Sequence, residues 1–415
     1  MSTISAERRV DLTDVELFAE GDPHQAWRWL RDHAPVYWNS DGSDQGGFWA
    51  LTRYEDLMFA YRDPATFSSR EGTVIGGSFR SERDTASGQM IICSDPPAHR
   101  QLRQQVHRGF EQQMVRRIRQ RVADSAAQAV QRIVRDGGCD AATDLAPELP
   151  VAVLAEMFGL DRPDAIALLE MSRDIIGYQD QTALSEEDLA KERVRLVSAH
   201  ARLLEWLMRL IDQRRRSPGD DLPSALLAGQ LNGRQLNLGE MLYNCLNVVV
   251  GGNETTPYTA CAGIAALIEF PEQQERLYQD PSLLPTAVDE ILRWTSTNAY
   301  VGRTLTRDLV LHDTPMQAGQ RVTLWNAAAN RDERQFPDAD TFDVGRQPNH
   351  HLAFGAGNHR CIGQYVAREE VTALFAQLAE RRLRLALDGP IRRLRSNFMQ
   401  GTTSMPVRVL SVDQP

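Results

Sequence analysis

The stretch Phe354-Gly355-Ala356-Gly357-Asn358-His359-Arg360-Cys361-Ile362-Gly363 distinguishes one of the five cysteines of this chain. Its glycines permit tight turns and positive φ angles around Cys361. A helix is predicted from Ile362 to Arg382, so the sulfur would lie beside the unpaired N–H groups and positive dipole end of a helix N-terminus. Such surroundings lower the pKa of a thiol and favour the thiolate. The stretch therefore predicts a functional thiolate, and an inert cysteine in a glycine-rich turn is the alternative.

The bulk composition is that of an ordinary globular protein. The chain has 415 residues, of which 42% are hydrophobic and 25% are charged, which is enough for a large core. Its formal net charge of −10 gives no reason to expect nucleic-acid binding. The other cysteines are scattered without C-x-x-C spacing, which argues against disulfides and a structural zinc site. We therefore expect a reducing, cytoplasmic setting and no nucleic-acid partner.

The sequence predicts neither a leader peptide nor a membrane anchor. The first residues, MSTISAERRVDLTD, contain no apolar run of the kind found in signal peptides. A membrane-spanning helix needs about 20 apolar residues. The nearest candidate, 241–267, is interrupted by three asparagines and Glu254. We expect no membrane segment.

Helical periodicity dominates the chain, with short strand patterns near both ends. Helices are expected at Pro23–His33, Ala98–Gly109, Gln112–Asp136, Leu149–Phe158, Glu186–Arg215, Leu238–Ile268, Pro271–Asp280 and Leu283–Trp294, besides the helix after Cys361. Strands are expected at Val36–Trp38, Phe48–Thr52, Val301–Thr304, Leu309–Leu311, Arg321–Leu324, Leu383–Leu387 and Val407–Leu410. This order predicts a mostly α protein with small β-sheets (α+β), folded as one domain over residues 1–415.

Two glycines interrupt the longest apolar helix, in Val249-Val250-Gly251-Gly252-Asn253-Glu254-Thr255-Thr256. Each costs about 1 kcal/mol relative to alanine inside a helix. An acid and two β-branched alcohols follow them in an apolar setting. The pattern indicates either a kink at an irregular packing site or a helix opened beside a cofactor.

Two pairs of charged residues have helical spacing. Glu290 and Arg293 are three residues apart, and His99 and Arg103 are four apart, so each pair shares a helix face. A surface ion pair and a solvated basic face are the ordinary interpretations. Arginine also binds carboxylates in a bidentate manner, which makes 99–103 a candidate site for an acidic ligand.

Taken together, these motifs resemble those of the cytochrome P-450 family. Residues 354–363 match its haem-binding loop, F-G-x-G-x-H-x-C-x-G, at every defining position. Residues 251–255 resemble its [AG]-G-x-[DE]-T motif, 290–293 its E-x-x-R motif, and 95–103 its D-P-P-x-H-x-x-x-R helix. The matches keep the order of the family from Val36 to the C-terminus, so the resemblance covers essentially the whole chain. One departure is Ala339, which stands where many members have proline and concerns the scaffold.

The resemblance implies the cytochrome P-450 fold, with haem b between a long distal helix and the helix after the cysteine loop. Cys361 would ligate the iron, and Phe354 would pack near its sulfur. The remaining implied cofactor-binding residues are His99, Arg103, Arg303, His359, Gly252 and Gly363.

Further roles follow from the same resemblance. Thr255 would steady iron-bound dioxygen and its proton-donating water, and Glu254 would belong to the proton route from solvent. Arg346 would complete a buried triad with Glu290 and Arg293 that braces the cysteine loop. Removing one member of such a triad would leave a buried charge unpaired and cost roughly 3–5 kcal/mol.

The family also implies the reaction and its partners. O2 would be the co-substrate, and electrons would pass from NAD(P)H through a ferredoxin and its reductase to a monomeric enzyme without an appended reductase domain. One oxygen atom would enter a small-molecule substrate and the other would leave as water. Two alternatives are an H2O2-driven peroxygenase or decarboxylase and a non-catalytic haem sensor. Glu254 and Thr255 argue against the first, and Cys361 with Thr255 argues against the second.

The substrate is the least specified feature. The expected pocket residues are Val74, Phe79, Asn247, Val250, Gly251, Ala299, Val301 and Thr402. Their mixture of apolar and polar side chains favours a medium-sized, partly polar molecule over a plain hydrocarbon. By fold-level analogy we expect hydroxylation or epoxidation in polyketide-type or peptide-type secondary metabolism, on a substrate that is free or tethered to a carrier protein.

Overall fold

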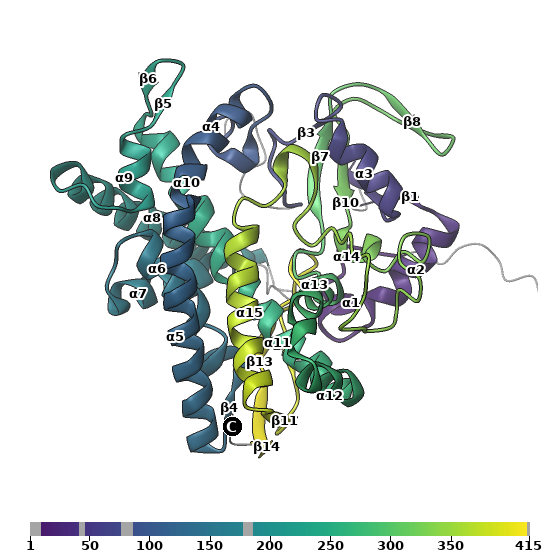
Figure 1. Ribbon diagram of the computed structural model, residues 1–415. Helices are drawn as coiled ribbons and strands as arrows, with labels where there is room; N and C mark the ends of the chain where they lie inside the picture. The colour runs from purple at the N-terminus through teal and green to yellow at the C-terminus, as the bar shows by residue number, and fades with distance from the viewer. Residues whose placement is uncertain (1–9, 41–45, 76–85, 177–185, 413–415) are drawn as a thin grey trace, which may run out of the picture.

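Helices make up most of the molecule, and small sheets lie at its edges (Figure 1). The computed structural model describes residues 10–40, 46–75, 86–176 and 186–412. Its helices are α1 Val15–Ala19, α2 Pro23–His33, α3 Tyr54–Arg62, α4 Ala98–His107, α5 Gln112–Asp136, α6 Glu148–Met157, α7 Arg162–Ile176, α8 Glu186–Arg216, α9 Leu222–Leu227, α10 Leu238–Asn253, α11 Thr255–Glu269, α12 Pro271–Gln279, α13 Leu284–Thr295, α14 Asn326–Ala329 and α15 Gln364–Glu380. None of these described helices combines the length and apolarity needed to cross a bilayer.

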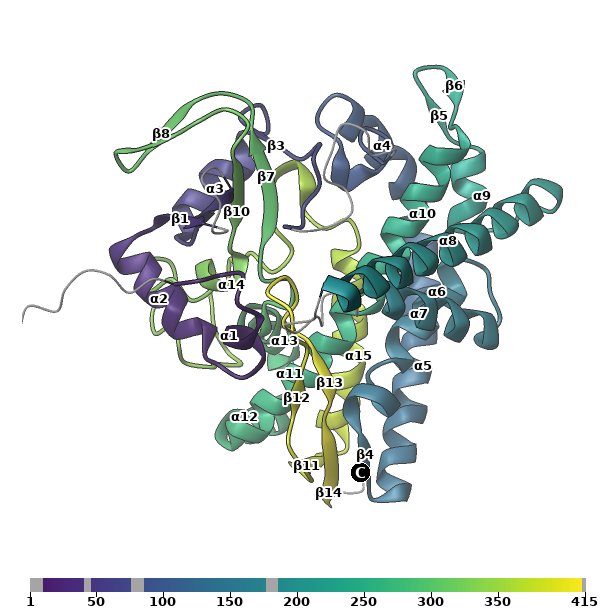
Figure 2. The same ribbon diagram turned by 180° about the vertical axis from the view of Figure 1, so that it is seen from behind.

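The strands are short and pair across long sequence distances. They are β1 Val36–Ser40, β2 Gly47–Leu51, β3 Phe67–Ser68, β4 Gly138–Asp140, β5 Gln230–Leu231, β6 Arg234–Gln235, β7 Val301–Leu305, β8 Leu309–Leu311, β9 Thr314–Met316, β10 Arg321–Leu324, β11 Arg384–Leu387, β12 Arg392–Arg393, β13 Thr402–Ser404 and β14 Pro406–Ser411. The largest sheet has the order β1-β2-β10-β7-β3, with β10 parallel to β2. A second sheet, β11-β14-β4, joins the C-terminal strands to the turn after α5 (Figure 2). Both sheets therefore join segments far apart in the sequence.

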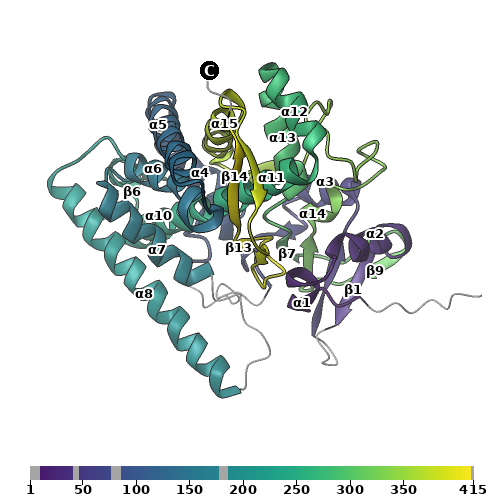
Figure 3. The same ribbon diagram turned by 90° about the horizontal axis from the view of Figure 1, so that it is seen from below.

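The main hydrophobic core lies among α5, α6, α10, α11, α13 and α15. Helix α15, which follows the cysteine loop, packs against α5 on one side and α13 on another (Figure 1). Helix α8 runs along one edge of the molecule (Figure 3). A smaller cluster around Trp27 and Trp325 joins α1 and α2 to the large sheet. The segment that carries Cys361 therefore stands between the helical core and the sheet.

Periodicity predicted α2 and α5 with the observed bounds, and two other predictions needed correction. The helix expected over 238–268 is divided at Glu254, which ends α10 and precedes α11. The helix expected from Ile362 begins at Gln364, with Gly363 as its N-cap. Helices α1, α3, α7 and α9 were not predicted, because their patterns are short or their apolar residues lack a single clear face.

Candidate active site

The cysteine loop is built on glycines that have positive φ. Gly355 and Gly357 have φ of +63° and +66°, the left-handed region that glycine adopts without strain. A Cβ on Gly357 would collide with the backbone carbonyl oxygen of Tyr61 in α3, so only glycine lets these two segments approach. The backbone N–H of Cys361 donates to the carbonyl oxygen of Phe354 at 2.9 Å, which closes the loop. The motif thus determines the place of Cys361 through backbone geometry.

The pKa of the Cys361 thiol is shifted upward, whereas the sequence predicted a downward shift. Burial is the largest cause, because an enclosed thiolate loses its hydration. The backbone N–H of Gly363 and the charges of Arg103 and Arg360 act in the opposite direction without outweighing it. The prediction considered only the helix end and could not include the loss of hydration at the sulfur caused by segments distant in the sequence. A metal cation at the sulfur would supply the positive charge that favours the thiolate.

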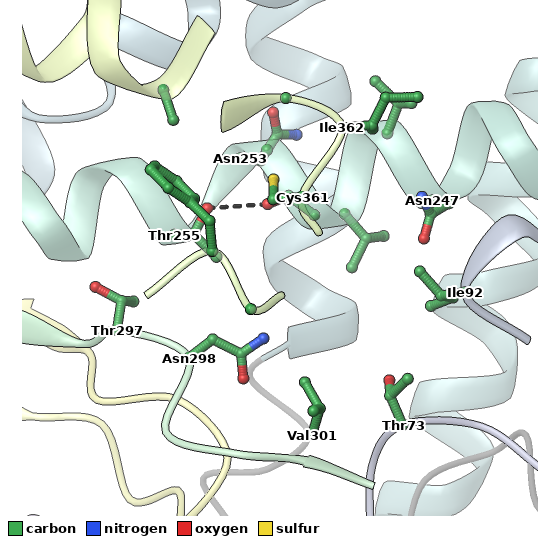
Figure 4. A pocket seen from close by; sticks show the side chains of 18 of the residues that line it. Thr73, Ile92, Asn247, Asn253, Thr255, Thr297, Asn298, Val301, Cys361 and Ile362 are labelled. Atoms are coloured by element: carbon green, nitrogen blue, oxygen red, sulfur yellow. Dashed lines mark hydrogen bonds between the residues drawn. The ribbon is translucent and has the colours of Figure 1, made fainter. Parts of the chain in front are cut away.

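A cavity of about 600 Å³ lies between the cysteine loop and the α10–α11 junction. Cys361 of the cysteine loop and Thr255 of α11 both line it (Figure 4). Phe354, Gly363 and Gly252 are also among the lining residues. A Cβ added at Gly251 or Gly252 would meet no atom within 4 Å, so both glycines leave open space for a ligand. The two motifs recognised in the sequence therefore face one another across a single hollow.

Four basic side chains, predicted to bind the propionates, line the same cavity: His99, Arg103, Arg303 and His359. The two imidazole rings lie 4.0 Å apart between centroids, and both Nε2 atoms are buried without a partner among the described residues. Burial is the main cause of the low pKa values of these imidazoles, about 4 for His99 and about 2 for His359. Both imidazole rings are therefore neutral. Arg303 is only 4% exposed, and its guanidinium donates to the neighbouring carbonyl oxygen of Gly302 at 2.6 Å. Buried donors of this kind fit the carboxylates of a haem group.

The two residues at the helix break face different surroundings. The Thr255 hydroxyl lines the cavity and donates to the carbonyl oxygen of Gly251 at 2.9 Å (Figure 4). Glu254 is 2% exposed and accepts from Arg173 Nε of α7 at 2.8 Å. Burial raises the pKa of the Glu254 carboxyl, and Arg173 and Tyr258 oppose the shift. Because the Arg173 side chain is 35% exposed, it links Glu254 to the surface of the protein.

Glu370 of α15 is a buried acid that the sequence analysis missed. It lines the cavity, is 3% exposed, and accepts from the Thr256 hydroxyl at 3.1 Å through Oε2. Its Oε1 has no partner among the described residues, and burial raises the pKa of this carboxyl to about 8. The adjacent Glu369 suggested a solvated helix face. The spacing of Val366, Glu370 and Leu374 on one apolar stripe was the signal that could have found it.

The buried triad is in contact. Glu290 and Arg293 are fully buried and joined by two hydrogen bonds of 2.7 Å. Arg346 Nε lies 3.2 Å from the Glu290 carboxylate. Arg293 also donates at 2.8 Å to the carbonyl oxygens of Asn330 and Ala339. These bonds tie α13 to the segment that leads into the cysteine loop.

Most of the expected pocket residues line the cavity, but two do not. Val74, Asn247, Val250, Gly251 and Val301 line it, and Phe79 lies outside the described residues. Ala299 instead packs in the core cluster of Trp27 and Trp325. Thr402 belongs to β13, where it pairs with Arg393. Side chains alternate in direction along extended chain, so Asn298, the neighbour of Ala299, faces the cavity instead, and Met399, which pairs with Asn298, also lines it.

Comparison with known proteins agrees with this geometry. A family model described as cytochrome P-450 matches residues 20–386. A methyl-branched lipid omega-hydroxylase of Mycobacterium tuberculosis is 35% identical over 410 residues, covering 96% of this chain and 94% of that protein. A steroid C26-monooxygenase of Mycolicibacterium smegmatis is 33% identical over 404 residues, covering 96% of this chain and 95% of that protein.

The fold is similar to that of solved structures as well. The crystal structure of OxyD, involved in the biosynthesis of vancomycin-type antibiotics, superimposes with a TM-score of 0.84 at 32% identity. The match covers 97% of this chain and 100% of that one. The mostly helical fold with small sheets, expected from the sequence, is thus confirmed over nearly the whole length.

Proposed function

The chain belongs to the cytochrome P-450 family and is a monooxygenase of that family, and we propose that it hydroxylates or epoxidises a medium-sized organic molecule bound beside Cys361. The observation that carries this proposal is the cavity in which Cys361, Thr255 and four basic side chains meet. A monooxygenase needs such a cavity, because cofactor, dioxygen and substrate must share one enclosed space.

We infer that haem b is the cofactor. Cys361 would ligate its iron, and His99, Arg103, Arg303 and His359 would bind its propionates, because both imidazole Nε2 atoms lack a partner in the described part of the chain and both guanidinium groups line the same cavity. When bound, the haem supplies the activation of O2, with one oxygen atom entering the substrate and the other leaving as water. The triad of Glu290, Arg293 and Arg346 would brace the loop.

We assign proton transfer to the α10–α11 break. The Thr255 hydroxyl would hold a water or dioxygen in the cavity, since it stands at the lining and is oriented by the carbonyl of Gly251. Glu254 would exchange protons with solvent through the side of the molecule where Arg173 is partly exposed. The raised pKa of Glu254 supports this role, because a carboxyl that titrates closer to neutral pH accepts and releases protons more readily.

We further infer that electrons come from NAD(P)H through a ferredoxin and a ferredoxin reductase, and that the enzyme acts as a monomeric single domain. The full-length similarity to bacterial relatives supports the inference. For the substrate, the named relatives act on a methyl-branched lipid and a steroid, and OxyD belongs to antibiotic biosynthesis. We propose a molecule of secondary metabolism, of polyketide or peptide type, either free or tethered to a carrier protein.

The test combines spectroscopy with a substrate screen. The reduced, CO-bound holoenzyme should show the red-shifted Soret band of thiolate-ligated haem, and a histidine-type spectrum would overturn the haem-thiolate assignment. A spin-shift screen of candidate metabolites should then identify ligands that the enzyme oxidises with ferredoxin, reductase and NAD(P)H. Turnover with H2O2 alone, at the ferredoxin-supported rate, would indicate a peroxygenase instead.

A further inference from the structure

Two carboxamides face the cavity from opposite walls. Asn247 projects from α10, and Asn298 projects from the segment between α13 and β7 (Figure 4). Neither side chain makes a hydrogen bond to another described residue. The two amides are thus polar groups that this cavity presents to whatever occupies it.

Asn298 is the more constrained of the two. Its Oδ1 atom is fully enclosed and has no hydrogen-bond partner in the described part of the chain. Its backbone forms an antiparallel bridge with Met399, and the flanking Ala299 N–H donates to the carbonyl of Phe398 at 2.9 Å. The segment is therefore held on both sides. Because this oxygen has no accessible surface, the end of the amide that a bound group can approach is its Nδ2 group, which is not enclosed.

The surroundings of Asn298 favour an uncharged ligand. Ile92, Val250, Val301 and Phe398 are among the lining residues on the side away from the cysteine loop. The two arginines of the described lining, Arg103 and Arg303, are those assigned to the haem propionates. The one carboxyl in the described lining is that of Glu370 on α15. Apart from these two arginines, the described lining contains no guanidinium group that could bind an anionic substrate.

We propose that Asn298 is a specificity-determining residue that hydrogen-bonds a hydroxyl or carbonyl oxygen of an otherwise apolar, uncharged substrate. The proposal rests on the proposed function, since it concerns the same cavity. The amide of Asn298 suits both groups, because its N–H can donate to a hydroxyl oxygen or to a carbonyl oxygen. Sites that hydrogen-bond a substrate in this way discriminate strongly against analogues that lack the group, whose binding leaves the amide unpaired.

The experiment measures binding of matched ligands to the holoenzyme. The probes are p-menthane, menthone and menthol, and cyclododecane, cyclododecanone and cyclododecanol. Dissociation constants come from spin-shift titration and, independently of the haem signal, from isothermal titration calorimetry. The quantity compared is the preference, defined as the Kd of the hydrocarbon divided by the Kd of its alcohol or ketone. Using this ratio cancels differences in size and shape between variants.

Asn298→Leu should lower the preference at least tenfold, because leucine has nearly the same shape but no polar atoms. Asn298→Ala is the second variant and should lower it as well. Asn232→Ala, on the exposed turn between β5 and β6, is the control outside the cavity and should alter the preference less than threefold. Cyclododecanecarboxylate should bind the wild type at least tenfold more weakly than cyclododecanol.

Several outcomes would overturn the assignment. These are an unchanged preference in both Asn298 variants, an equal loss in Asn232→Ala, tighter binding of the carboxylate, or no binding of any alcohol or ketone. Failure of the proposed function is distinguishable, because it appears beforehand as a wild-type protein without the thiolate-type CO spectrum. If the wild type has the thiolate-type CO spectrum and any of the four outcomes above is observed, only the proposed role of Asn298 is refuted.

Discussion

Replacement of Glu370 by glutamine should stabilise the protein, and more so as the pH rises. Burial raises the pKa of the Glu370 carboxyl from 4.5 to about 8, so the native state holds a proton that the unfolded chain releases. Below the pKa of the carboxyl in the unfolded chain, Glu370 is protonated in both states and does not reduce the free energy of unfolding. The free energy of unfolding then falls as the pH rises toward and through the pKa of the carboxyl in the native protein. Between these limits the native state loses up to about 1.4 kcal/mol per pH unit.

The same relation gives the size of the effect. At pH 8 the cost of the carboxyl is about 4 kcal/mol, and at pH 5 it is under about 1 kcal/mol. Glutamine carries no such cost, and its carbonyl oxygen can still accept from the Thr256 hydroxyl. For a chain of 415 residues, with an unfolding entropy of about 2 cal/mol/K per residue, the gain at pH 8 corresponds to about 4–5 °C in Tm.

The assay is thermal unfolding of the haem-loaded protein by far-UV circular dichroism at pH 5, 6, 7 and 8 and constant ionic strength. Glu369→Gln is the matched control, because Glu369 is the adjacent residue but pairs with Arg119 at the surface. Exposed pairs of this kind contribute about 0–1 kcal/mol, so this variant should melt close to the wild type. If the difference between Glu370→Gln and the wild type does not widen from pH 5 to pH 8, Glu370 is ionised in the native protein and our account of its burial is wrong.

Three further predictions concern the cysteine, the helix break and the triad. Cys361→Ser should abolish the thiolate-type CO spectrum of the reduced protein; a retained band would show that another residue ligates the iron. Thr255→Ala should keep that band but divert electrons from substrate to hydrogen peroxide, measured as peroxide formed per NAD(P)H consumed, and unchanged coupling would remove Thr255 from its proposed role. Glu290→Gln should destabilise the protein by about 3–5 kcal/mol in urea unfolding, because Arg293 would be left as a fully buried charge without its carboxylate. A loss below about 1 kcal/mol would show that backbone carbonyls alone satisfy Arg293.

Much of the site could be predicted because its motifs are local. Gly355 and Gly357 are needed because the backbone has a positive φ at both and passes close to α3. This requirement can be recognised in the sequence as glycines at fixed spacing before Cys361. Glu290 and Arg293 meet because they are one helical turn apart. The bounds of α2 and α5 follow from a continuous apolar stripe along each helix.

Other features depend on which neighbours the fold brings close. The pKa of the Cys361 thiol rises because the loop is enclosed by segments distant in sequence, whereas its local helix end predicted a fall. Ala299 faces away from the cavity because side chains alternate in direction along extended chain, and Thr402 lies in β13, which pairs with β12. The apolar stripe that Glu370 shares with Val366 and Leu374 indicates burial, but only the folded molecule shows that α15 meets α5, α11 and α13.

Sequence alone was sufficient to identify the family, the cysteine loop and the two motifs that face one another across the cavity. Each of these motifs is defined by residues at fixed spacing within one helix or one turn. Tertiary structure alone decided where charge is buried and which side chains remain without partners. Desolvation and hydrogen bonding depend on atoms contributed by elements distant in the sequence, as with Arg173, which lies 81 residues before Glu254, and with the amide of Asn298. Local patterns therefore identified the family, and the packing around them determined which polar groups line the cavity.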